Sequence, residues 1–187
     1  MPKVKGSTFL ARLAFLDSRF GDKGKQKVLA ALSQSDREFL SGKILPATWY
    51  DRNFFGRFVD TIDQELGKGD HRLTRLMGYY AADLQLNGAY DAFIRHNDPS
   101  FLLSRANSVW QIFHDFGHIE ILLEGKSRCR LWLKDLKFSD VATVEGIIGW
   151  TLKGLELSGC QEIRFRYDPH PTPTKDAYRI LVAWRMQ

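Results

Sequence analysis

The chain has 187 residues, a formal net charge of +5, 44% hydrophobic residues and 26% charged residues. This length fits one domain, and the composition excludes a disordered chain and a small disulfide-stapled scaffold. The sequence has no apolar run of about 18 residues and no secretory leader, so we expect a cytoplasmic protein without a membrane span.

The first 117 residues have the apolar periodicity of α-helices. Buried-stripe spacing (i, i+3, i+4) is clearest after Asp51, where Phe54, Phe58 and Ile62 recur on one face. Asp98-Pro99 has the residue types of a helix start, and the segment after it stays helical in pattern as far as Gly117. The predicted helices begin near Ser7, Lys23, Ser35, Asp51, Leu73 and Asp98.

After Gly117 the period of the apolar residues changes from 3.6 to 2, which indicates strands. One hairpin is predicted around the turn 125–127, then a helix from Asp140 to about residue 157, then a second hairpin over 162–185. We therefore predict an α+β fold, in which an N-terminal layer of five or six helices precedes a ββαββ unit. The unit forms a four-stranded antiparallel sheet. Residues 1–187 form one domain, in which residues 1–117 are helical and residues 118–187 make up the ββαββ unit.

No set of residues for catalysis is visible, so we expect a protein that is not an enzyme. The sequence has no phosphate loop and no serine elbow. His114 and His118 have the spacing of two metal ligands on a helix, but Gly117 should end that helix, so no metal is expected. Cys129 and Cys160 are interpreted as reduced, small core residues.

Two features remain for a binding function. The helix after Asp140 carries Gly146, Gly149 and Gly154, and this smooth face is explained either by close packing of the protein's own sheet or by a bound ligand. The predicted outer face of the sheet is basic, but only Trp132 offers an aromatic ring to a nucleic-acid base, so we expect no nucleic-acid partner and a solvated or protein-contacting face.

Four segments carry a resemblance to known families, namely 5–10, 101–117, 146–160 and 162–167. In their order and residues they resemble an uncharacterised paralogous family abundant in myxobacteria. More remotely the chain resembles the 4-vinyl reductase domain, the heme–nitric-oxide-binding domain and the TRAPP vesicle-tethering subunits. The resemblance implies an α+β domain with an internal apolar pocket, which works as a sensor or a scaffold.

The resemblance also bears on cofactors. The heme-binding branch carries a Tyr-x-Ser-x-Arg motif, which this chain lacks, and the cysteine-rich end of the 4-vinyl reductase domain is missing. We therefore predict no cofactor. Heme is a disfavoured alternative, for which His114 is the only histidine in a suitable position.

The function predicted is that of a non-enzymatic sensor or regulatory domain in bacterial signalling, with an apolar pocket for a hydrophobic small molecule. The alternative is a protein–protein interaction scaffold whose core is filled by side chains. A void of about 300 Å³ or more would favour the sensor. The predicted pocket has Gly146 and Gly149 as its floor and a wall of apolar side chains from the helices. The wall residues are Phe58, Leu76, Tyr80, Trp110 and Phe113.

We also expect a homodimer, or a heterodimer with a related chain. The aromatic helices 51–66 and 98–116 present more apolar surface than one sheet should cover.

Overall fold

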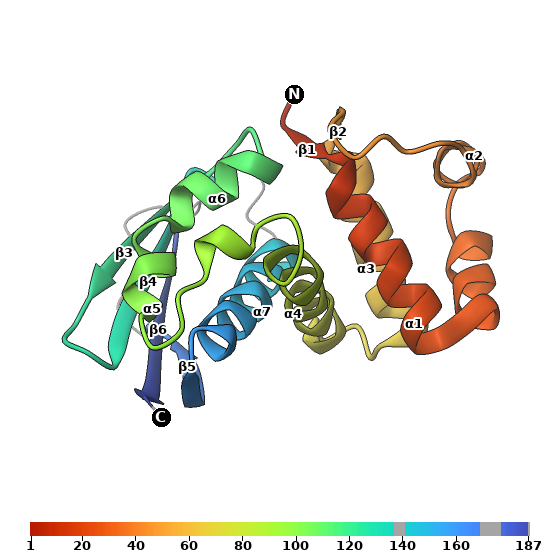
Figure 1. Cartoon of the computed structure of the whole chain (residues 1–187). Coiled ribbons are helices and arrows are strands. Elements are labelled where there is room, and N and C mark those ends of the chain that lie inside the picture. Colours follow the sequence, from red (N-terminus) through yellow and green to blue (C-terminus); the bar gives the residue numbers. More distant parts are fainter. Residues whose placement is uncertain (137–140, 169–176, 187) are drawn as a thin grey trace.

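The structure is a computed structural model that describes residues 1–136, 141–168 and 177–186. Over these ranges the chain forms seven α-helices, one short 3-10 turn, Asp91–Phe93, and a main sheet in its C-terminal part (Figure 1). The α-helices are α1 (Gly6–Ala31), α2 (Gln34–Ser41), α3 (Arg52–Leu66), α4 (Arg72–Leu86), α5 (Pro99–Leu103), α6 (Ala106–Phe113) and α7 (Val141–Leu157).

The main sheet is four-stranded and antiparallel throughout, in the order β3-β4-β6-β5. Its strands are β3 (His118–Leu123), β4 (Arg128–Lys134), β5 (Cys160–Tyr167) and β6 (Tyr178–Met186). Helix α7 joins the two hairpins, which confirms the predicted ββαββ order and the α+β class. The predicted start of that helix, Asp140, lies outside the described residues.

The local sequence signals explain several helix ends. The Asp51 side chain accepts a hydrogen bond from the backbone N–H of Asn53 at 2.8 Å, and Asp98 caps α5 through the N–H of Phe101 at 3.2 Å. Gly21 has a φ of 60° and kinks α1, so the two helices predicted on either side of it join into one bent helix.

Two features differ from the sequence prediction. The single helix expected after Asp98 is broken into α5 and α6, because Ser104 and Arg105 form a turn between them. A second, two-stranded antiparallel sheet is formed by β1 (Lys3–Lys5) and β2 (Trp49–Asp51). Strands of three residues are too short to show an alternating pattern, which is why the sequence did not reveal them.

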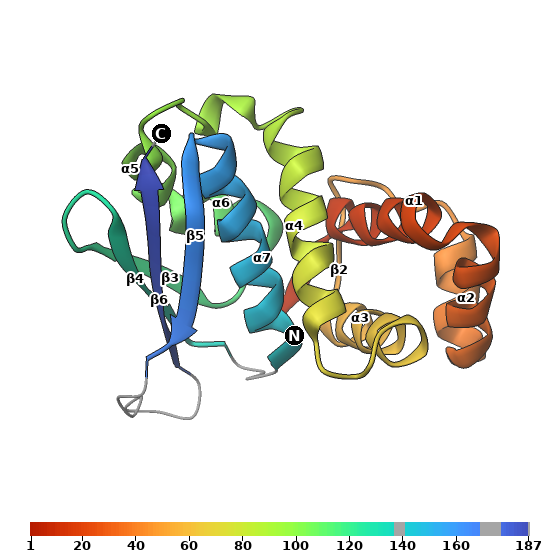
Figure 2. The ribbon, with the colours of Figure 1, turned by 90° about the horizontal axis from the view of Figure 1, so that it is seen from below.

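The elements form successive layers, which lie side by side in Figure 2. The order is the sheet, then α7, then α4, then the group α1–α3. Helices α4 and α7 approach so closely because both carry glycine at their contact. A Cβ atom at Gly78 would overlap the backbone of Gly146, and a Cβ at Gly149 would overlap the carbonyl oxygen of Arg75. The glycine face of α7 is therefore covered in this region by a helix of the same chain, rather than by the sheet.

The aromatic stripe of α3 is covered within the chain as well. Phe58 and Ile62 are fully buried, and Phe54 packs against Phe9 of α1 and Phe39 of α2, with ring centroids 5.1 and 4.6 Å away. The surface on which the expectation of a dimer rested is thus largely internal, and the dimer itself stays a prediction.

Burial also accounts for the cysteines, which are free thiols. Cys129 and Cys160 both lie in the core, and burial raises the pKa of the Cys129 thiol to about 12. Both are therefore protonated core side chains. Among the helices of the described ranges, none combines the length and apolar character that a bilayer crossing needs.

Candidate functional site

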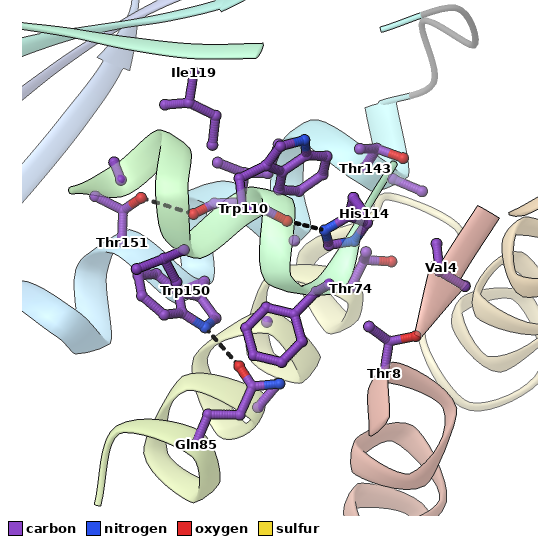
Figure 3. Close-up of a pocket in the computed structure, with 18 of the residues that line it drawn as sticks. Val4, Thr8, Thr74, Gln85, Trp110, His114, Ile119, Thr143, Trp150 and Thr151 are labelled. Atoms are coloured by element: carbon purple, nitrogen blue, oxygen red, sulfur yellow. Dashed lines mark hydrogen bonds between the residues drawn. The ribbon is translucent and has the colours of Figure 1, made fainter. Parts of the chain in front are cut away.

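An apolar cavity of about 100 Å³ lies where the helical layer meets α6, α7 and the sheet (Figure 3). Its walls come from β1, α1, α3 and α4 on one side and from α5, α6, α7, β3 and β4 on the other. Most of the lining is aliphatic or aromatic. The lining residues with polar side chains are Thr8, Arg12, Arg52, Thr74, Gln85, Trp110, His114, Thr143, Trp150 and Thr151.

His114 is the residue that follows α6, and its imidazole lines the cavity. Its ring stacks on the indole of Trp110, with centroids 3.6 Å apart and planes 9° from parallel. The carbonyl oxygen of Trp110 lies 3.3 Å from Nδ1 of His114 and also accepts the backbone N–H of His114 at 3.0 Å. Trp110 in turn donates its indole N–H to the carbonyl of Phe116 at 2.6 Å. The ring of His114 is therefore held in one orientation.

The N-terminal strand holds the backbone of the same segment. Val4 of β1 forms an isolated antiparallel bridge with His114, and the N–H of Asp115 donates to the carbonyl of Lys3 at 3.2 Å. The Asp115 carboxylate accepts the N–H of Lys3 at 2.6 Å. Since β1 leads directly into α1, the position of His114 is tied to the helical layer.

The cavity lowers the pKa of its basic groups, because charge is poorly solvated there. Burial lowers the pKa of His114 to about 3, so the imidazole is neutral at ordinary pH. Burial also lowers the pKa of Arg12 to about 10, which leaves the guanidinium charged at neutral pH. Arg52 donates a hydrogen bond to the hydroxyl of Thr143 at 2.7 Å. Of the described residues that line the cavity, none is an aspartate or a glutamate.

The structure brings three of the seven predicted pocket residues together around the cavity: Trp110, Phe113 and Gly146. The others lie elsewhere. Phe58 belongs to the core between α1 and α3, Leu76 is 44% exposed, and Gly149 sits in the α4–α7 contact. Tyr80 packs against Phe15, with its hydroxyl 3.5 Å from the carbonyl of Ala14.

The polar residues of the cavity that sequence reasoning missed include Arg12 and Thr74. A signal for Arg12 was present, since it lies at helical spacing between Thr8 and Phe15, both of which are buried. A charge on a buried stripe is uncommon and points to a special environment. Thr74 gave no such signal, because threonine is ordinary on a helix.

The size of the cavity bears on the choice between sensor and scaffold. At about 100 Å³ it is smaller than the void of about 300 Å³ that was expected for a ligand pocket. It is nevertheless larger than the volume one water molecule needs. A ligand larger than a single small ring would require the walls to move apart.

His114 and His118, whose spacing would suit two ligands on one helix, do not share a helix. Helix α6 ends at Phe113, and Gly117, with a φ of 70°, turns the chain into β3, where His118 lies 3.9 Å from Glu120. Within the described ranges no three His, Cys, Asp or Glu side chains gather as a metal site.

Several basic residues on the outer face of the sheet form ion pairs with glutamates on the same face. Lys134 pairs with Glu120 at 2.6 Å and Arg185 with Glu162 at 2.8 Å. The ring of Trp132 lies under Lys134 and Arg179, whose charged atoms are 3.7 and 4.5 Å from its centroid. The aromatic ring on this face is therefore in contact with the protein's own cations, and the absence of a nucleic-acid partner stays a prediction.

Comparison with solved structures finds H-NOX proteins that share this architecture. The fold is that of H-NOX domains. An H-NOX protein from K. algicida in the Fe(II) unliganded state has a TM-score of 0.74 at 10% identity, over 98% of this chain and 97% of that one. An H-NOX protein from S. oneidensis in the Fe(II)NO state has a TM-score of 0.72 at 14% identity, over 97% and 99%.

A third structure, an oxygen-binding H-NOX domain related to soluble guanylate cyclases, has a TM-score of 0.72 at 12% identity, over 97% of this chain and 95% of that one. At these identities the comparisons establish the fold alone. No family model and no curated protein sequence matches the chain.

The comparisons correct the predicted cofactor and narrow the resemblance. The heme–nitric-oxide-binding domain is confirmed as the relative in fold, while the myxobacterial family, the 4-vinyl reductase domain and the TRAPP subunits receive no support. The prediction of no cofactor, with heme disfavoured, is wrong, because the structural neighbours are heme proteins. H-NOX structures in Fe(II) states, and a structure concerned with heme redox potential, match over nearly the whole chain. The missing Tyr-x-Ser-x-Arg motif was given too much weight.

Proposed function

We propose that this chain is a heme-binding sensor domain, in which His114 would bind the iron. The observation that carries the proposal is the placement of a neutral, rigidly held imidazole in the wall of an apolar cavity, within an H-NOX fold. When bound, a heme iron supplies a coordination site for a diatomic gas, as in the oxygen complex and the Fe(II)NO state of the neighbours.

The hydrogen bonding of His114 fits this role. If Nδ1 carries the proton, it donates to the carbonyl of Trp110, and Nε2 then keeps its lone pair. Metal-binding histidines almost always donate their second ring nitrogen to such a carbonyl or to a carboxylate, which fixes the tautomer and orients the ring. Trp110 therefore acts as the residue that positions His114.

The low pKa of His114 supports the same role. A metal ligand must be the neutral imidazole, and protons compete with a metal for its lone pair. Because burial holds the pKa near 3, this competition is absent over the whole range of ordinary pH. The mostly apolar walls would also keep water away from a bound group.

The cavity volume sets a condition on the proposal. A heme is far larger than about 100 Å³, so the helical layer and the α6–α7 wall must separate to admit it. The α4–α7 glycine contact resists such a movement near Gly149. Opening is therefore expected on the side of β1, where Val4 meets His114. Because β1 leads into α1, a movement of His114 would be transmitted through Val4 to α1. Such transmission suits a sensor that has no catalytic step of its own.

The test is a titration of the heme-free protein with hemin, followed by absorption spectroscopy and native mass spectrometry. The proposal predicts one heme per chain and the spectrum of a histidine-ligated iron. The His114→Ala variant should lose that spectrum, whereas His118→Ala, a matched change four residues away on β3, should keep it. A wild-type protein that takes up no heme would overturn the proposal and favour the scaffold.

A further inference from the structure

The cavity contains an arginine that has no hydrogen-bond or ion-pair partner among the described residues. Arg12 of α1 lines the cavity, and its Nε atom is buried without a hydrogen bond. Across residues 1–136, 141–168 and 177–186, Arg12 makes no hydrogen bond or ion pair, and its guanidinium instead faces the ring of Phe55, 5.3 Å from the centroid. The residue as a whole is partly buried, and a charge withdrawn from water in this way normally has a counter-charge, because leaving water without one is costly.

A second unpartnered donor faces the same space. Thr74 of α4 is 1% exposed, and its hydroxyl has no hydrogen-bond partner among the described residues. It lines the cavity together with Arg12. Buried hydroxyl groups without a partner are rare in native proteins and call for an explanation such as a bound molecule.

The space in front of Arg12 is kept open by a glycine. A Cβ atom at Gly146 of α7 would meet a single neighbour within 4 Å, the Nη2 atom of Arg12 at 3.8 Å. This distinguishes Gly146 from Gly149, where the helix contact itself requires glycine. Gly146 therefore leaves the guanidinium group reachable from the cavity.

The charge of the whole lining has one sign. Two arginines, Arg12 and Arg52, line the cavity, and no described lining residue is acidic. An apolar space of about 100 Å³, with the positive charge of Arg12 at its edge and no acidic residue in the described lining, fits an anion that carries a small apolar body. The planar fork of an arginine matches a carboxylate in particular.

We infer that the heme-free cavity binds a small organic monocarboxylate, with its carboxylate on Arg12 and Thr74 and its apolar body, of about three to six carbon atoms, among the aromatic walls. This site concerns the chain without a cofactor, so it stands or falls separately from heme binding. The hydroxyl of Thr74 donates one hydrogen bond and the guanidinium donates the others.

The test measures binding of benzoate and isobutyrate to the heme-free protein by calorimetry and by thermal shift, each beside its uncharged amide of nearly the same shape. At least one acid should bind about tenfold or more tightly than its amide, since charge-assisted hydrogen bonds are the stronger ones. If the amides bind as well as the acids, or neither acid binds at millimolar concentration, the inference is overturned.

Variants then locate the site. Arg12→Met should lose acid binding by about tenfold or more. The protein should stay folded, because the change removes a charge that has no ion-pair partner among the described residues. Arg19→Met, a matched change at an exposed position of the same helix, should leave binding unchanged. Unchanged binding in Arg12→Met would overturn the site.

Gly146→Leu, which fills the space before the guanidinium, gives a second measurement should Arg12→Met fail to fold. It should abolish binding of the acids, and retained binding in this variant would overturn the site. None of these readouts requires heme, so a failure of hemin binding and a failure of acid binding are distinguishable.

Discussion

The rings of His114 and Trp110 are stacked in parallel, with their centroids 3.6 Å apart, and the carbonyl of Trp110 lies 3.3 Å from Nδ1 of His114. One residue thus fixes both the plane and the tautomer of the imidazole. The pair occupies the last turn of α6 and the residue after it, where the chain leaves the helix for β3. This arrangement makes the orientation of His114 depend on the stability of α6.

Replacing Trp110 by phenylalanine should therefore weaken the fold as well as the site. The change removes the donor to the buried carbonyl of Phe116 and leaves that oxygen without its bond, at a cost of about 1–3 kcal/mol in the free energy of unfolding. Urea denaturation measures this loss. Heme affinity should fall in the same variant, because the stacking surface shrinks. An unchanged stability would show that the Phe116 carbonyl finds another donor.

The pH dependence of stability should reveal the buried imidazole. The pKa of His114 is near 3 in the folded chain and near 6.5 in an unfolded one, so the unfolded state binds the extra proton in between. Stability from this group is fully present above about pH 6.5 and is lost as the pH falls toward 3, by at most about 1.4 kcal/mol per pH unit.

The comparison of wild type with His114→Phe isolates that contribution. Between about pH 6 and 4.5 the free energy of unfolding of the heme-free wild type should fall more steeply with falling pH than that of the variant. The difference in slope should approach the value for one bound proton, about 1.4 kcal/mol per pH unit. A change at the exposed His96 to glutamine is the control for background titration. Parallel curves for wild type and His114→Phe would contradict the burial of the ring.

Two glycines of α7 should respond in opposite directions to the same substitution. Gly146→Ala meets only Arg12 at 3.8 Å, so it should raise the free energy of unfolding by up to about 1 kcal/mol through helix propensity. Gly149→Ala would overlap the backbone of Arg75 and should lower it by about 1–3 kcal/mol or more. Denaturation of the two variants side by side checks this, and equal effects would refute the α4–α7 packing described above.

The fold could be predicted from the sequence to a large extent because its signals are local. Apolar spacing around Phe54 and Phe58, the cap at Asp98 and the alternation after Gly117 each depend on a few neighbouring residues. The pairing of β1 with β2 depends on residues far apart in the chain, and strands this short carry no periodic signal. Similarly, no local pattern separates α5 from α6.

The candidate site was harder to predict, because it depends on which faces of distant helices meet. Gly146 and Gly149 are one helical turn from each other and look alike in sequence, yet one opens a cavity and the other closes a helix contact. Leu76 lies on the apolar stripe of its helix but remains 44% exposed. Arg12 was not considered, although its spacing from the buried residues Thr8 and Phe15 could have marked it.

The most direct test of the account is rescue of His114→Gly with free imidazole. In this variant the cavity gains room where the side chain stood, and added imidazole can take its place beside Trp110. The account predicts that His114→Gly loses the absorption spectrum of histidine-ligated heme and regains it when imidazole is added, while His118→Gly keeps it throughout. A His114→Gly variant that binds heme with an unchanged spectrum, without imidazole, would contradict the assignment of His114 as the axial ligand.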